Sequence, residues 1–308
     1  MIYDFFITSR SKNDDRMFPQ FLCIGAQKAG TTWLHDNLSK QPQIWLPPVK
    51  EIHFLDHPEP SLFQLLFSRR SHHKLARANA MATAYGMISS RSKFSDLAYA
   101  VKFAYMPRSW EWYASLFPDD PERLCGEICP GYARLSREPI AAVVHHNPRI
   151  KVIYLLRDPI DRAWSALAMH FRKRPGSSVV DDSAKDIIVR LKTSKSFGHC
   201  QYERNIDAWL EHLPNDQIYF GFFDRIREDP SGYLAEILRF LEISDEVESH
   251  SAHIMVNASL GEKISPEIER DIARLLKNEA ASLHRRFANP YTERWLAHAE
   301  AAADSSAI

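Results

Sequence analysis

Residues 151–156 read Lys-Val-Ile-Tyr-Leu-Leu, and this nearly continuous apolar run constrains the fold more than any other feature of the chain. A strand that is apolar on both faces is typical of the centre of a parallel sheet, where helices cover both sides. Asp158-Pro159 follows it with the residue types that begin a helix, Asp as N-cap and Pro at the first helical position. Apolar residues then recur at helical spacing: Ile160, Ala163, Trp164, Leu167 and Phe171.

Strands and helices alternate along the rest of the chain. Short apolar strands are expected at residues 21–25 and 217–223. Helices are expected at residues 32–39, 138–146, 202–213, 232–241 and 266–286, the last of these being the final long helix. The alternation predicts a single α/β domain with a central, mostly parallel sheet flanked by helices. This domain is expected to cover residues 18–300, between a polar arm at 1–17 and a frayed tail at 301–308.

The composition of the chain excludes several classes of function. The 308 residues include 39 Lys plus Arg and 39 Asp plus Glu, so the formal net charge is zero. A broadly basic surface for nucleic acid or for an anionic membrane is therefore not expected. No apolar run approaches the roughly 20 residues of a membrane span. The N-terminus lacks the basic start and long apolar stretch of a signal peptide. The expectation is a cytoplasmic enzyme.

The cysteines do not form a motif. Cys125 and Cys129 are the only two that lie close in sequence, and their spacing is not the Cys-x-x-Cys of zinc or redox sites. Reduced, structural thiols are therefore expected at all four positions, which are Cys23, Cys125, Cys129 and Cys200.

A glycine-containing loop lies between the first predicted strand and the first predicted helix, with the sequence Gly-Ala-Gln-Lys-Ala-Gly-Thr-Thr at residues 25–32. Gly30 permits a tight turn, and the N–H groups that follow it lie at a helix N-terminus, where anions bind. Lys28 adds a full charge, and Thr31 and Thr32 add hydroxyl donors. A Walker A loop places Lys directly after the last Gly, where this chain has Thr31. The loop predicts a phosphate site of another type, and the alternative is a glycine turn with a surface lysine.

A second anion site is predicted at the end of the central strand. Arg157 follows that strand directly, at the sheet edge where ligands of open α/β sheets bind. Its guanidinium can hold a phosphate through two hydrogen bonds, and Ser165 lies two turns into the next helix as a second donor. The alternative is that Arg157 pairs with Asp161 while Ser165 is a packing residue. Two anion sites at two strand–helix junctions favour a ligand with separated anionic groups.

Four ordered motifs resemble a known family. The loop QKAGTTWL resembles the 5′-phosphosulfate loop of sulfotransferases that use 3′-phosphoadenosine 5′-phosphosulfate (PAPS), and KVIYLLRDPIDRAWSAL resembles their 3′-phosphate motif. LPPVKEIHFLD at 46–56 resembles a segment of heparan sulfate 3-O-sulfotransferases and bacterial relatives. GEICPGY at 126–132 resembles their Glu-Lys-x-Pro-x-Tyr motif. The resemblance covers residues 20–290 and implies an enzyme that moves a sulfuryl group to a hydroxyl or amine and releases 3′-phosphoadenosine 5′-phosphate (PAP).

The resemblance also implies which residues bind the donor. Lys28 would contact the sulfuryl group and the bridging oxygen, and Trp33 would stack on adenine. Arg157 and Ser165 would bind the 3′-phosphate. The whole implied donor site comprises Lys28, Ala29, Gly30, Thr31, Thr32, Trp33, Arg157 and Ser165.

The same resemblance implies a carboxylate base. Glu51 would deprotonate the acceptor hydroxyl in an in-line transfer, with His53 and Asp56 beside it. Lys28 would stabilise the charge that builds on the leaving oxygen. His53 is the alternative base, as in the histidine-using cytosolic relatives. No metal is implied.

The chain departs from the family pattern at two places. The lysine of the Glu-Lys-x-Pro-x-Tyr motif is Ile128 here, which argues against a polyanionic acceptor such as heparan sulfate. The Lys-Gly-Arg cofactor loop is also missing near the C-terminus, where Asn257–Lys263 is the candidate substitute. The expected acceptor is an alcohol on a carbohydrate or secondary metabolite. Two other functions stay open: a P-loop kinase that uses ATP and magnesium on a small molecule, and a non-catalytic scaffold that binds PAPS.

Overall fold

The structure, a computed structural model, describes residues 18–56, 99, 102, 103, 106, 108–172, 184–194, 196–243 and 264–305. The predicted arm at 1–17 and the candidate loop Asn257–Lys263 lie outside the described residues.

A parallel sheet forms the centre of the molecule. Its strands are β1 (Phe21–Gly25), β2 (Ile44–Trp45), β3 (Leu124–Ile128), β4 (Lys151–Leu156) and β5 (Ile218–Phe222). They pair in the order β2-β3-β1-β4-β5, and every pairing is parallel. All of β1 and all of β4 except Lys151 are buried. This confirms the prediction of a central apolar strand in a parallel α/β sheet.

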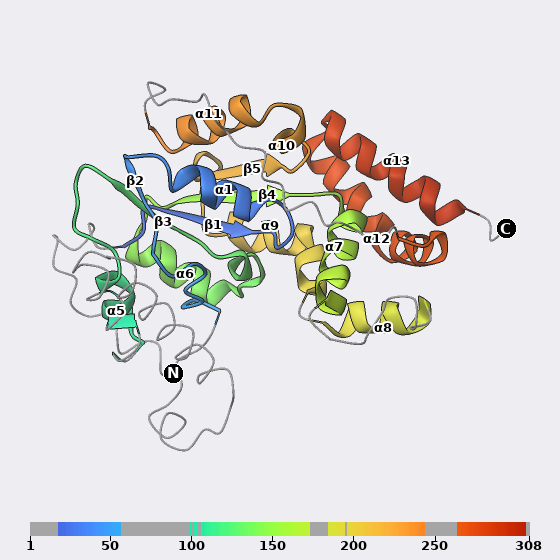
Figure 1. Ribbon diagram of the computed structural model, residues 1–308, viewed down its shortest axis with the longest axis horizontal. Helices are drawn as coiled ribbons and strands as arrows, with labels where there is room; N and C mark the ends of the chain where they lie inside the picture. The colour runs from blue at the N-terminus through green and yellow to red at the C-terminus, as the bar shows by residue number, and fades with distance from the viewer. Residues whose placement is uncertain are drawn as a thin grey trace, which may run out of the picture.

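Helices cover both faces of the sheet and one of its ends (Figure 1). The helices are α1 (Thr31–Leu38), α5 (Trp110–Ser115), α6 (Arg137–His146), α7 (Pro159–Arg172), α8 (Ala184–Thr193), α9 (Tyr202–Leu210), α10 (Arg225–Glu228), α11 (Pro230–Phe240), α12 (Pro266–Phe287) and α13 (Pro290–Asp304). Figure 1 shows α11 on one side of the sheet and α6 and α9 on the other, while α7, α8, α12 and α13 gather at one end. Short 3₁₀ helices lie at η2 (Pro130–Arg134), η4 (Phe197–Cys200) and η5 (Asn215–Gln217).

The C-terminal part of the chain differs from its prediction. The helix at 266–286 is not the last, because α13 follows it and extends to Asp304, four residues into the segment expected to be frayed. Asn289 begins α13 by accepting hydrogen bonds from the N–H groups of Tyr291 and Thr292. Trp295 and Ala299 are buried, which explains why this end of the chain is ordered as a helix.

Some helix boundaries and two strands also differ from their predictions. The predicted helix 202–213 ends at Leu210, and the short strands β2 and β3 were not predicted.

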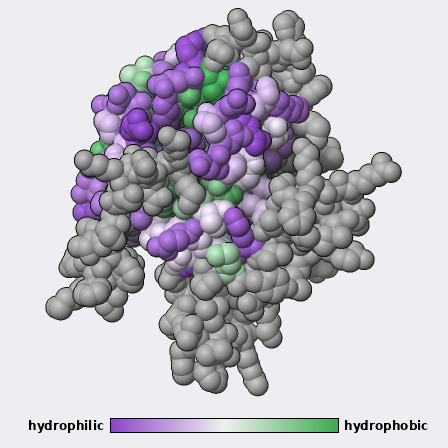
Figure 2. Space-filling view, turned by 90° about the vertical axis from the view of Figure 1, so that its left-hand side faces the viewer, coloured by the Kyte–Doolittle hydropathy of each residue, from purple (hydrophilic) through white to green (hydrophobic). Residues whose placement is uncertain are grey.

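The four cysteines are buried and unbridged, as expected. No helix in the described ranges has the length and apolar character needed to cross a membrane. Figure 2 shows one face of the molecule, where hydrophilic side chains cover most of the described surface and hydrophobic ones appear in small areas.

Candidate active site

The loop between β1 and α1 has the backbone of an anion site. Gly30 is the N-cap of α1 with φ 95°, and a Cβ at this position would overlap the Ile226 side chain. Since glycine has no side chain to cap the helix, the first-turn N–H groups remain available to an anion. Lys28 is half-buried within the same loop, also at positive φ. Thr31 is buried and Thr32 exposed.

A lysine that the sequence argument did not select joins this loop. Lys50 Nζ donates a hydrogen bond to Thr32 Oγ1 at 3.1 Å. The contact brings a second cation to the first turn of α1, in addition to Lys28. The only available signal in the sequence was its position directly before Glu51 in the KEIHFLD segment.

The β4–α7 junction lies against the phosphate loop. Arg157 Nη1 donates to the backbone oxygen of Lys28 at 3.0 Å, so the two predicted anion sites meet at one edge of the sheet. Arg157 Nη2 also lies 3.6 Å from Asp161 Oδ2, which was the structural alternative. Its Nε is buried and makes no hydrogen bond with any described residue. Burial is the main cause that lowers the pKa of Arg157, yet a guanidinium stays charged at neutral pH.

The other predicted donor contacts are more enclosed. Ala29 is fully buried, and Ser165 on α7 is 5% exposed. Trp33 is 3% exposed, and its indole stacks on Tyr233 with ring centroids 5.5 Å apart. A stacked adenine would therefore need the other face of the Trp33 ring. The roles of these three residues in donor binding stay predictions.

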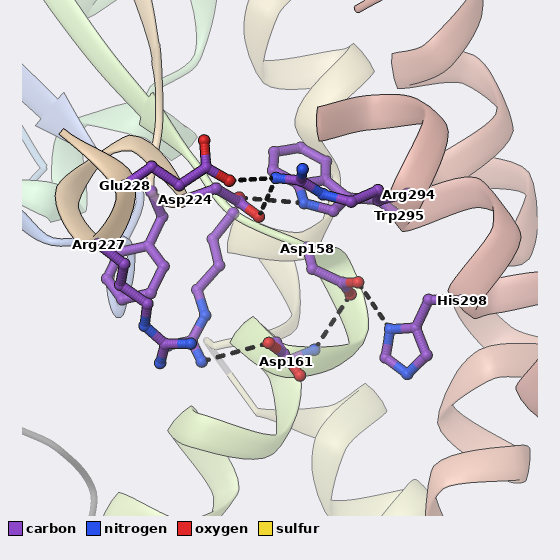
Figure 3. A pocket seen from close by; sticks show the side chains of 10 residues that line it. Asp158, Asp161, Asp224, Arg227, Glu228, Arg294, Trp295 and His298 are labelled. Atoms are coloured by element: carbon purple, nitrogen blue, oxygen red, sulfur yellow. Dashed lines mark hydrogen bonds and ion pairs between the residues drawn. The ribbon is translucent and has the colours of Figure 1, made fainter. Parts of the chain in front are cut away.

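A cavity of about 380 Å³ opens beside Arg157 (Figure 3). At the cavity wall, two guanidinium groups lie over the ring of Phe223. Arg157 Cζ is 4.5 Å and Arg227 Cζ is 5.5 Å from the ring centroid. The cavity is lined by Arg157, Asp158, Asp161, Phe223, Asp224, Arg227, Glu228, Arg294, Trp295 and His298.

The acidic side chains of this cavity already have cationic partners. Arg294 pairs with Glu228 at 2.8 Å and with Asp224 at 3.4 Å. His298 Nδ1 lies 2.7 Å from Asp158 Oδ2. Arg227, by contrast, forms no ion pair with a described carboxylate. It is therefore the cavity cation most available to a ligand.

Sequence reasoning did not find Arg227, Arg294 or His298. Arg227 belongs to the short helix α10, and the other two lie on α13, more than 130 residues after Arg157 in the chain. Figure 3 shows the α13 side chains facing those of α7 and α10 across the cavity. Only the tertiary fold brings these segments together.

The KEIHFLD segment forms a second cluster of charged groups. His53 lies between two carboxylates, with Nε2 3.5 Å from Glu51 Oε2 and Nδ1 2.9 Å from Asp56 Oδ2. Burial lowers the pKa of His53, but its contacts with Asp56, Cys129 and Glu51 outweigh burial and raise the pKa to about 12. Contact with two carboxylates therefore favours the protonated form of His53. The Glu51 side chain is 38% exposed, so an acceptor can reach it.

The donor atoms of His53, Asp56 and Cys129 lie within 4.8 Å of one another, a separation that suits a metal ion. Metal binding would require a neutral imidazole and a thiolate. The raised pKa of His53 opposes the first, and burial raises the pKa of Cys129 to about 12, which opposes the second. The absence of a metal from the reaction stays a prediction.

Comparisons with known proteins identify relatives of this chain. A model described as the sulfotransferase family matches residues 19–247. Heparan sulfate glucosamine 3-O-sulfotransferase 6 of Homo sapiens is 24% identical over 259 residues, which cover 80% of this chain and 58% of the relative. Heparan sulfate glucosamine 3-O-sulfotransferase 3A1 of Mus musculus is 28% identical over 144 residues, or 42% of this chain and 34% of the relative. The chain thus spans less than two thirds of the length of these curated relatives.

Among solved structures, a sulfotransferase from Alicyclobacillus acidocaldarius has a TM-score of 0.61 at 20% identity, and the match covers 90% of this chain and 98% of that one. This similarity shows a shared fold.

Proposed function

This chain belongs to the sulfotransferase family, and from that premise we propose that it transfers a sulfuryl group from PAPS to a hydroxyl or amine. The observation that carries the proposal is the contact between the two predicted anion sites at one sheet edge. Arg157 donates to the Lys28 carbonyl, and Lys50, the residue before Glu51 in the chain, donates to Thr32. Anion-binding groups and a carboxylate base are what a sulfuryl transfer requires.

The residues present fit the donor. Lys28, Ala29, Gly30, Thr31 and Thr32 would hold the phosphosulfate, because the α1 N-terminus offers unsatisfied N–H groups to an anion. Arg157 and Ser165 would hold the 3′-phosphate, and the buried Arg157 Nε without a described partner supplies a donor for it. Arg227 adds a charge beside Arg157. The donor itself supplies the sulfuryl group, and PAP is the product.

Glu51 is proposed as the general base. The acceptor hydroxyl oxygen forms a bond to sulfur while the bond between sulfur and the bridging oxygen breaks, and the acceptor proton passes to the carboxylate. His53 is already protonated and so accepts no further proton. Its role is to hold Glu51 in place while Asp56 holds His53, which gives a chain of three charged groups joined by two contacts.

The proposed acceptor is an alcohol on a carbohydrate or secondary metabolite. The matched relatives are named for heparan sulfate, which makes a sugar hydroxyl a reasonable acceptor. Position 128, however, is an isoleucine that is 2% exposed on β3, so it offers no cation to a polyanionic chain. This favours an acceptor that carries fewer charges than heparan sulfate.

A kinase that uses magnesium fits the site less well. The acid at the end of β4 would have to bind the metal, and Asp158 is 7% exposed with both oxygens engaged. Its Oδ1 accepts from the N–H groups of Ile160 and Asp161, and its Oδ2 contacts His298.

A melting experiment tests the proposed donor. PAP at 100 times its Kd, without metal, should stabilise the protein by about 2.7 kcal/mol, which corresponds to a rise in Tm of roughly 4 °C. Stabilisation by ATP and magnesium, with no response to millimolar PAP, would support the kinase instead. Labelled PAPS with a panel of sugar and phenol acceptors then tests turnover. Tight PAP binding without turnover on any acceptor would indicate a scaffold.

A further inference from the structure

Glu127 is a buried acid that the proposed chemistry does not use. It lies on β3 and is 1% exposed. Tyr113 Oη donates to it at 2.6 Å, and Tyr132 Oη lies 3.1 Å from each of its oxygens. Among the described residues, no Lys, Arg or His forms an ion pair with it. A buried carboxylate without a paired cation is costly, and an apolar residue of similar volume would fill the same space.

The third hydrogen bond of Glu127 reaches the candidate base. Its Oε1 accepts from the backbone N–H of Ile52 at 2.9 Å, and Ile52 lies between Glu51 and His53. Both neighbours have left-handed backbone conformations, with φ of 59° for Glu51 and 55° for His53. Non-glycine residues adopt this region at a cost in free energy, so they keep it only where surrounding groups hold the backbone.

Further contacts hold the same segment from other sides. Arg108 Nη2 donates to the carbonyl oxygens of Ile52 at 2.9 Å and His53 at 2.7 Å. Tyr132 Oη, which donates to Glu127, accepts from the N–H of Phe54 at 2.9 Å. Glu127 is therefore the buried end of a network that fixes the backbone on both sides of Ile52.

We propose that Glu127 is a positioning residue for the catalytic segment, which sets the place of Glu51 and His53 through the N–H of Ile52. This proposal rests on the proposed function, since it assigns a role to Glu127 in the same sulfuryl transfer. It also gives the GEICPGY motif a task, because Glu127 and Tyr132 are both members of it.

The contribution of Glu127 to stability depends on pH, because its carboxyl group is buried. Burial raises the pKa of Glu127 to about 7, against the hydrogen bonds from Tyr113, Ile52 and Tyr132 and the charge of His53. Because this folded pKa is above the ordinary 4.5, the ionised group costs stability as pH rises through about 7. The titratable groups around it are Tyr113 on α5, Tyr132 on η2, Tyr99, Arg108, His53 and Cys129. A variant that lacks the carboxyl group does not have this loss of stability at pH 8.

Two variants test the proposal. Glu127→Leu removes the acceptor for Ile52 N–H and should lower kcat about 10- to 100-fold, as misplaced catalytic groups do, with PAP affinity changed less than about twofold. Glu127→Gln keeps an amide oxygen for Ile52 N–H and should recover most of the lost kcat. Glu127→Gln should keep its Tm at pH 8, whereas Glu127→Leu should lose some, because it leaves the buried Tyr113 hydroxyl and Ile52 N–H without an acceptor. The matched control is Glu279→Leu. It removes a half-buried carboxylate that also accepts a backbone N–H, from Glu203 at 2.8 Å, away from this segment.

The proposal is overturned if Glu127→Leu keeps wild-type kcat per folded molecule, or if its kcat and PAP affinity fall together while the Gln variant is no better. Hydrogen exchange provides a readout without turnover: the Ile52 amide should exchange faster in Glu127→Leu than in wild type or Glu127→Gln. Unchanged exchange at the Ile52 amide would also overturn the proposal. If Glu127→Leu folds poorly, its exchange at Ile52 is compared with that of Glu127→Gln. If the wild type shows no transfer at all, the proposed function fails, and exchange at Ile52 still decides the role of Glu127.

Discussion

His53 and Glu51 lie in different surroundings. Two carboxylates contact the imidazole, one at each ring nitrogen, which holds the proton on His53. Glu51 reaches solvent on one side and lies beside Lys50 in the chain. We therefore expect the Glu51 carboxylate, and not the nearby His53, to take the proton of the acceptor.

Replacing Glu51 with Gln should stop transfer while leaving the donor site intact. Gln keeps the shape of the side chain but accepts no proton, so kcat should fall about 10²- to 10⁴-fold with PAP affinity nearly unchanged. Steady-state kinetics and calorimetry measure the two effects. Wild-type turnover in Glu51→Gln together with an inactive His53→Ala would instead make His53 the base.

The two arginines over Phe223 should differ in their effect on donor binding. Arg157→Ala should weaken PAP binding by about 2–3 kcal/mol, because a buried guanidinium loses charge-assisted hydrogen bonds. Arg227 is exposed, so Arg227→Ala should cost less, about 1 kcal/mol. Arg149→Ala, an exposed arginine outside the cavity, is the control. Equal PAP affinities in all three variants, measured by calorimetry, would show that the donor does not bind in this cavity.

Among the helices, α13 is tied to α7 by one histidine. His298 on α13 contacts Asp158, the N-cap of α7, and Glu269 on α12 at 3.2 Å. The hydrogen bond to Asp158, opposed by partial burial, raises the pKa of His298 to about 9. The folded pKa is above the ordinary 6.5, so the associated stability is complete below about pH 6.5 and is lost as pH rises through about 9.

His298→Gln should therefore destabilise the protein most at low pH. Since the side chain is 32% exposed, solvent screening reduces the expected loss to about 1–2 kcal/mol at pH 6. The loss should shrink by more than half at pH 10. Thermal melts of both proteins at pH 6, 8 and 10 measure it, and a Tm difference that does not change with pH would contradict the ion pair.

The sequence predicted elements with a strong apolar pattern and missed those without one. KVIYLL and the Asp158 cap gave β4 and the start of α7 at their observed positions. β3 contains Gly126 and Glu127, which weaken a strand pattern, and β2 has two residues. The buried face of α13 includes three residues with little apolar contrast, Thr292, Ala299 and Ala303, so Trp295 alone marks it clearly.

The site was predictable only where chemistry is local in the chain. The Gly30 turn and Arg157 after its strand follow from neighbouring residues. Glu127 bonding to Ile52 and Arg227 lying over Phe223 beside Arg157 depend on how separate segments pack. No spacing in the sequence encodes those contacts.

At the scale of the whole molecule, the C-terminal helices complete both the core and the cavity. Trp295 is 2% exposed, contacts Phe222 of β5 with ring centroids 5.8 Å apart, and donates to Asp224 at 3.2 Å. Packing of α13 against the sheet and the shape of the cavity therefore depend on the same side chain.

Trp295→Ala should cost about 3–5 kcal/mol of folding free energy, as truncation of a buried tryptophan does. PAP affinity should also fall, because the residue lines the cavity. Denaturant unfolding and calorimetry measure these effects, with Glu300→Ala on the exposed side of α13 as the control. A stable variant with normal PAP binding would mean that α13 is dispensable to both.

The family match ends at residue 247, yet Arg294, Trp295 and His298 stand on the cavity wall. Under the proposed function, the nucleotide would be bound partly by the matched region and partly by α13, which lies outside it. Two proteins that are alike over the matched region would then differ in donor affinity through this one helix. Grafting α13 from another member would accordingly change donor binding while leaving Glu51, the proposed base, unchanged.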